Sequence, residues 1–178
     1  MKMAQIVGVS KWATRFIWAA IVQGFLALII TAIIVLPIIT PSASRVIAGG
    51  GAGTWFFVGY ISYIIVGVMS VALTALFYFY LEGVLKKTYG SIANVLAALH
   101  LGLMNIGVIG STWLLMLAGY AGGAGSLSVQ SGGGGLNPGE IHSLIVGYPD
   151  PIGYFIIILG LGVLLGGLGY IITYLSKP

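Results

Sequence analysis

Residues 92–121 read IANVLAALHLGLMNIGVIGSTWLLMLAGYA and contain no Asp, Glu, Lys or Arg. A bilayer core about 30 Å thick needs about 20 apolar residues of helix to cross it. This stretch therefore predicts a membrane-spanning helix. Its length and its continuous apolarity are not those of the short alternating strands of an outer-membrane barrel.

Three further apolar stretches, also without a charged residue, have the length of a membrane span: 16–39, 55–81 and 152–175. The first is longer than the 7–15 apolar residues of a signal peptide, so we expect it to be retained. The predicted fold is all-α, an integral membrane four-helix bundle that forms a single domain over residues 1–178.

The composition agrees with a membrane protein. Of 178 residues, 59% are hydrophobic, 6% are charged and none is Cys, whereas soluble domains carry about 25% charged residues. This excludes a soluble enzyme, a disordered chain and a nucleic-acid partner. Without Cys, the chain has no disulfides and no thiolate metal ligands.

The cations outside the spans predict the orientation. One set of connections and ends holds six cations and the other holds only Arg45; the six are Lys2, Lys11, Arg15, Lys86, Lys87 and Lys177. The positive-inside rule places the six in the cytoplasm. We therefore expect a multi-pass plasma-membrane protein with both termini cytoplasmic and with connections 40–54 and 122–151 external.

The external connection 122–151 is rich in glycine, with Gly-Gly-Ala-Gly and Gly-Gly-Gly-Gly runs. Glycine-rich segments are flexible on their own. We expect contacts with a partner subunit to order this loop.

The fourth span contains a Gly-x-x-x-Gly step, Gly162 to Gly166. Small residues let helices approach closely in lipid. The step is explained by packing within the bundle or by packing on another subunit, and we expect both.

Polar residues lie at a similar depth in three spans. His100 is the ionisable residue within a span, and Gln23 and Thr74 occur at comparable depth, with Asn105 just beyond. We expect a structural polar cluster in which a neutral His100 bonds to Gln23 or Thr74. A haem or copper ligand, and a quinone or proton-path role, are the alternatives.

Two groups of residues are candidate metal ligands. Met104 is one turn from His100, and a His and a Met together suit copper(I). In the external loop, Glu140 and His142 with Asp150 are a nonspecific set, for which solvated loop residues are the simpler interpretation.

The stretch Leu99-His100-Leu101-Gly102-Leu103-Met104-Asn105-Ile106-Gly107 resembles the His-x-x-Leu-Met-Asn-x-Gly pattern of haem–copper oxidase catalytic subunits and their short four-helix relatives. Those proteins carry further His residues, whereas positions 98 and 102 here are Ala and Gly. The resemblance therefore implies no catalytic role, and at most a remnant ligand at His100. In general character the chain is similar to accessory subunits of archaeal oxidase and ammonia monooxygenase complexes.

The expected function is that of a noncatalytic accessory subunit of an energy-converting membrane complex, a terminal oxidase or a copper membrane monooxygenase. Its expected partners are other membrane subunits and lipids, and no cofactor is expected in the chain itself. The alternatives are a redox subunit that binds haem or copper through His100, and a small transporter or channel. The spans show no inverted repeat and no broken helix lined with charge, which disfavours transport.

Overall fold

The computed structural model describes residues 10–176, and these contain helices but no strand. The helices, in chain order, are α1 (Lys11–Val35), α2 (Ala43–Ala48), α3 (Gly53–Ser62), η1 (Tyr63–Met69), α4 (Ser70–Phe79), η2 (Tyr80–Val84), α5 (Ser91–Ser126), η3 (Val129–Ser131), α6 (Pro138–Ile145) and α7 (Pro149–Leu175).

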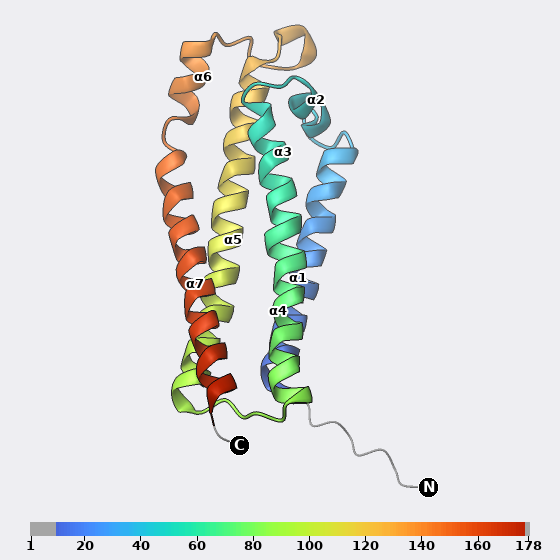
Figure 1. The fold of residues 1–178 in the computed structure, drawn as a ribbon. Coiled ribbons are helices and arrows are strands. Elements are labelled where there is room, and N and C mark those ends of the chain that lie inside the picture. The colour runs from blue at the N-terminus through green and yellow to red at the C-terminus, as the bar shows by residue number, and fades with distance from the viewer. Residues whose placement is uncertain (1–9, 177–178) are drawn as a thin grey trace, which may run out of the picture.

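Four helical stretches are long and apolar enough to cross a membrane (Figure 1): Lys11–Val35, Gly53–Val84, Ser91–Ser126 and Pro149–Leu175. This confirms the predicted all-helical fold and its four candidate spans. The short helices α2 and α6 both lie at one end of the bundle, α2 near α1 and α6 near α7, and the 85–90 connection lies at the other end.

The first span is shifted toward the N-terminus relative to the prediction, and begins at Lys11 instead of residue 16. Ser10 caps the helix by accepting a hydrogen bond from the Ala13 amide, and its hydroxyl bonds to the Glu82 carboxylate. The helix ends at Val35 because Leu36 precedes Pro37, and a residue before proline is pushed out of the helical region.

The second span is continuous from Gly53 to Val84 but alternates between α-helical and π-helical segments. Its segments η1 and η2 are π-helical, a form that is rare and often lies near functional sites. Within η1, Gly67 leaves room for the ring of Tyr63, whose carbon atoms lie 3.0 Å from the position that a Gly67 Cβ would take.

The third span extends farther than predicted. The Gly-rich residues 122–126 were expected to begin a flexible loop, but they continue α5. Glycine is needed here for close approach: a Cβ on Gly123 would lie 2.5 Å from Val46 Cγ1 and 2.8 Å from Gly53 Cα. Packing of α5 against α2 and α3 therefore holds this glycine-rich turn in a helix.

The remainder of the 122–151 connection is also folded. Its chain returns to the end of α5, where the Gly134 amide donates to the Ala124 carbonyl at 3.0 Å and the Leu136 amide to the Gly125 carbonyl at 2.9 Å. Asn137 and Glu140 form a capping box that starts α6. The chain's own hydrogen bonds thus fold this segment, and the expected contact with a partner subunit stays a prediction.

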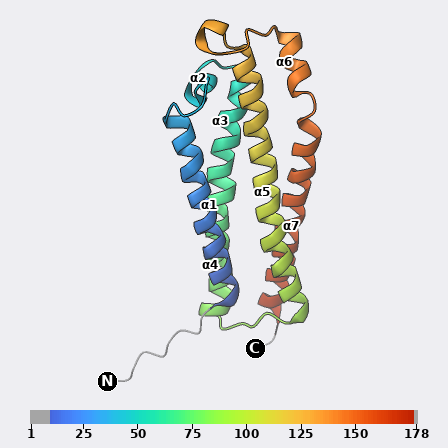
Figure 2. The same cartoon turned by 180° about the vertical axis from the view of Figure 1, so that it is seen from behind.

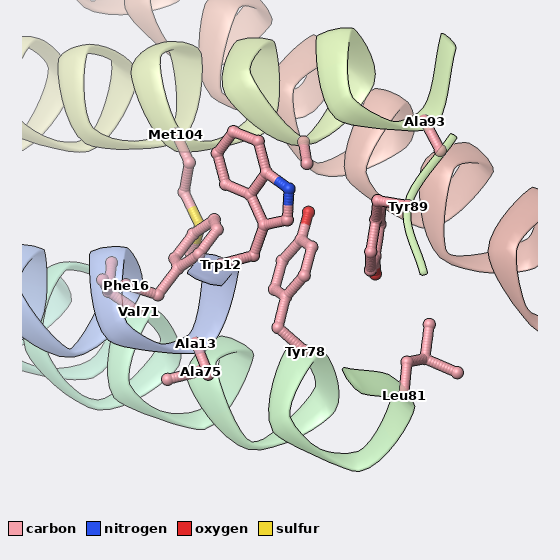
Figure 3. Packing of buried hydrophobic residues seen from close by; sticks show 11 residues of the cluster. Trp12, Ala13, Phe16, Val71, Ala75, Tyr78, Leu81, Tyr89, Ala93 and Met104 are labelled. Carbon is pink, nitrogen blue, oxygen red and sulfur yellow. The ribbon is translucent and has the colours of Figure 1, made fainter. Parts of the chain in front are cut away.

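The long helices pack in pairs: α1 on α4, α3 on α5, and α5 on α7 (Figures 1 and 2). One buried cluster joins α1, α4 and α5 near the 85–90 connection, with Trp12, Phe16, Tyr78 and Met104 pointing toward one another (Figure 3). The Phe16 and Tyr78 rings stack at 4.9 Å, and Trp12 Nε1 donates to Asn94 Oδ1 at 2.8 Å. Phe16 and Tyr78 of this cluster also pack against the ring of His100.

Candidate functional site

The α5–α7 interface depends on glycine. Gly162 and Gly166 face α5, where a Cβ on Gly162 would lie 2.7 Å from the Met104 amide nitrogen and a Cβ on Gly166 would lie 2.0 Å from His100 Nδ1. The Gly-x-x-x-Gly step therefore packs within this chain. It also makes the room in which the His100 ring lies.

His100 is buried, with 7% of its surface exposed, and its partner is Tyr78 of α4. The Tyr78 hydroxyl lies 3.1 Å from His100 Nδ1. The Phe16 ring lies 5.0 Å from the imidazole. Aromatic groups of α1 and α4 thus fix the orientation of the ring.

A groove of about 630 Å³ opens beside this pair, between the η1–α4 segment and α7. His100 and Met104 of α5 contribute to its lining. Its remaining walls carry mostly apolar side chains: Val66, Ser70, Leu73, Thr74, Phe77, Tyr78, Leu159, Val163, Gly166, Gly167, Tyr170 and Ile171. The Phe77 and Tyr170 rings meet edge to face at 6.3 Å and join the two walls.

The expected polar cluster is divided in two. Gln23 and Asn105 do meet, since Gln23 Nε2 donates to Asn105 Oδ1 at 2.8 Å. The Tyr63 hydroxyl donates to Gln23 Oε1, and Asn105 Nδ2 donates to the Leu101 carbonyl at 2.7 Å. This network links α1, η1 and α5 and has no bond to His100.

Thr74 does not join that network either. Its hydroxyl donates to the Ser70 carbonyl of its own helix at 2.8 Å, while its side chain lines the groove near His100. The expected bond from His100 to Gln23 or Thr74 was wrong, because similar depth does not fix which way a helical residue faces. Tyr78 was missed as the partner, although it lies one turn from Thr74 on the same face.

His100 and Met104 are the metal ligands that the sequence suggests, and both line the groove. They supply one imidazole and one thioether, and the other lining residues add no further His or Met. No lining residue is a cation that would pair with haem propionates. Within residues 10–176 no group of three or more His, Asp or Glu is arranged to hold a metal ion. Among the described residues, His100 and Met104 are therefore the candidate ligands for a haem or copper at this position.

Glu140 and His142 are exposed on α6. Glu140 accepts the Asn137 amide at 2.9 Å as part of the capping box. Side chains two residues apart on a helix do not face each other, so α6 does not direct Glu140 and His142 to one point. The geometry favours solvated surface residues.

A second, polar pocket of about 330 Å³ lies at the end of the bundle that holds the 85–90 connection. Lys11, Lys86 and Lys87 line it together with Glu82. Tyr89 closes one side, and burial raises the pKa of its phenol, with the Tyr78 and Glu82 side chains adding to the shift. Four charged side chains thus line this pocket, whereas none lines the groove.

Comparison of the chain with protein-family models, with curated proteins and with solved structures finds no match.

Proposed function

We propose that the chain is a noncatalytic accessory subunit of a larger energy-converting membrane complex. The observation that carries this proposal is the uncovered side of α7. In the most apolar stretch of α7, 17% of the residues are buried. Its packed side holds α5, while Gly153 and Gly160, seven residues apart on another side, have no neighbouring atom within 4 Å of a Cβ.

Glycine on a lipid-facing side contributes no packing, whereas small residues allow a second helix to approach closely. Gly153 and Gly160 therefore support a contact with a helix of another subunit. The resemblance of residues 99–107 to haem–copper oxidase subunits supports a terminal oxidase or a copper membrane monooxygenase as the complex.

The proposed setting is the plasma membrane, with both termini in the cytoplasm. Ser10 bonds to Glu82 and Lys87 Nζ donates to the Ser176 carbonyl, so the start of α1, the 85–90 connection and the end of α7 share one end of the bundle. Lys11, Arg15, Lys86 and Lys87 lie at that end, and Arg45 lies in α2 at the other. The remaining cations in the sequence count, Lys2 and Lys177, lie outside the described residues.

Isolation of the tagged chain from its own membranes in mild detergent tests the proposal, with the copurifying proteins identified by mass spectrometry. The Gly153→Leu/Gly160→Leu double variant should lose those partners while the chain keeps its helicity and thermal stability. Gly24→Leu on α1 is the matched control, because Gly24 also has no atom within 4 Å of a Cβ. A wild-type chain that migrates alone in native electrophoresis would contradict the proposal.

The alternative is a redox subunit that ligates haem or copper, and the observation in its favour is that His100 and Met104 line one groove. An optical spectrum and a metal analysis of the purified complex distinguish the two. In the accessory-subunit proposal, His100→Leu leaves the haem and copper content of the complex unchanged.

A further inference from the structure

The His100–Tyr78 hydrogen bond has a direction that can be assigned from the network. Tyr78 is 2% exposed, and within residues 10–176 its hydroxyl has one hydrogen-bond partner, His100 Nδ1. A buried hydroxyl needs an acceptor for its proton. If Nδ1 donated instead, the Tyr78 proton would have none. The phenol therefore donates to Nδ1, and the neutral imidazole carries its proton on Nε2.

That Nε2–H group has no acceptor in the part of the chain that the structure describes. The Nε2 atom nevertheless keeps some accessible surface. In residues 10–176 the fully buried side-chain polar atoms without a hydrogen-bond partner are Tyr89 Oη and Trp113 Nε1, and His100 Nε2 is not one of them. His100 is more than nine-tenths buried and lines the groove. Nε2 is thus an unpaired donor that is not fully sealed, on a residue that lines the groove.

The groove limits what that molecule can be. Its volume of about 630 Å³ lies within the roughly 300–1,000 Å³ of small-molecule sites. No Lys or Arg lines it, so it offers nothing to a phosphate headgroup, whereas Lys11, Lys86 and Lys87 line the separate polar pocket. A neutral, lipophilic molecule with a hydrogen-bond acceptor fits this lining.

We propose that the groove binds a lipid-soluble quinone. One quinone carbonyl accepts the His100 Nε2–H, and the ring lies against the aromatic walls that Phe77 and Tyr170 provide. The isoprenoid tail follows the apolar side chains of Val163 and Ile171 toward the bilayer. Binding alone is proposed, with no redox step. Quinone binding does not depend on the accessory-subunit role, because every residue that lines the groove belongs to this chain.

Binding is tested with the full chain in nanodiscs and decylubiquinone as the probe, with the dissociation constant measured by displacement of a photoreactive quinone analogue. His100→Leu removes the donor and should raise the dissociation constant about three- to ten-fold, the value of one neutral hydrogen bond. His100→Gln keeps an N–H donor and should stay closer to wild type. Thr14→Val is the matched control outside the groove, since the Thr14 hydroxyl likewise donates to a backbone carbonyl four residues back, that of Ser10, and this variant should bind as wild type does.

A steric variant keeps the test valid if His100→Leu fails to fold. Gly167 lines the groove and has no atom within 4 Å of a Cβ, so Gly167→Leu should fold and fill the groove. It should abolish photolabelling of α4 and α7. Equal labelling of wild type, His100→Leu and Gly167→Leu would overturn the proposal, because it would mean partition into lipid alone. Phospholipid without quinone in extracts of the purified chain, or a Soret band in its spectrum, would overturn it as well.

Discussion

At the scale of single residues, Gly166 is a position that has no room for a side chain. Its missing side chain leaves the space that the imidazole of His100 occupies, with His100 Nδ1 and Cγ at 2.0 and 2.3 Å from a built Cβ. His100 is held by Tyr78 and Phe16 on its other sides, so the ring cannot simply move away. Gly166 thereby joins helix packing to the candidate site.

Gly166→Ala should therefore destabilise the chain by about 1–3 kcal/mol, the usual cost of an overpacked contact. Gly102→Ala is the control on α5, since a Cβ there meets no atom within 4 Å. It should be neutral, or stabilise by up to about 1 kcal/mol through better helix propensity. Equilibrium unfolding in mixed micelles measures both. Equal stabilities for the two variants would show that the α5–α7 contact is looser than described.

Tyr63, like Tyr78, belongs to a buried hydrogen-bond network but was not among the polar residues predicted from the sequence. It donates to Gln23 Oε1 within a network that is otherwise satisfied by Asn105. Tyr63→Phe should destabilise by about 0.6 kcal/mol and at most about 1.7 kcal/mol, the range of interhelical bonds in membranes. Tyr154→Phe, at a side chain that is 66% exposed, should have no effect in the same unfolding assay. A neutral Tyr63→Phe would mean that Gln23 finds another donor.

At the scale of helices, the sequence predicted the spans well and their ends less well. Apolar length alone identified all four spans, because that property does not depend on neighbours. The extension of α5 to Ser126 could not be predicted, since the glycines of this turn pack closely on α2, α3 and α6, and the sequence does not show that packing. The site shows the same dependence on packing. The depth of a residue in its span follows from its position in the sequence, but the direction in which its side chain points depends on how the helices pack.

Helix α6 begins at a capping box formed by two residues close in sequence, Asn137 and Glu140. The Glu140 amide donates to Asn137 Oδ1 at 3.1 Å, and the Glu140 carboxylate accepts the Asn137 amide. Asn137→Ala should weaken the helix by about 0.5–2 kcal/mol, which hydrogen exchange of the α6 amides would detect as faster exchange. Ser143→Ala, at an exposed position in the same helix, is the control. Unchanged exchange in Asn137→Ala would show that packing, and not the cap, maintains α6.

At the scale of the whole molecule, the arrangement of the helices explains why the groove exists. Helix α5 packs on both α3 and α7, while α1 packs on α4. Helix α7 therefore rests mainly on α5, and the Phe77–Tyr170 pair bridges it to α4. A tighter bundle would close the space beside His100. The glycine-based contact with α5 holds α7 in place without a second helix beneath it.

The placement of charge across the molecule gives the orientation prediction. Among the described residues, Lys11, Arg15, Lys86 and Lys87 lie at one end and Arg45 at the other. Because cytoplasmic connections retain Lys and Arg, the α2–α6 end should face outward. The chain has no Cys, so single cysteines can be introduced without background. Ser126→Cys should react with a membrane-impermeant maleimide in intact cells, and Ser176→Cys only after permeabilisation; both side chains are exposed. The reverse pattern would invert the topology, and would place the polar pocket of Lys11, Lys86 and Lys87 outside the cell.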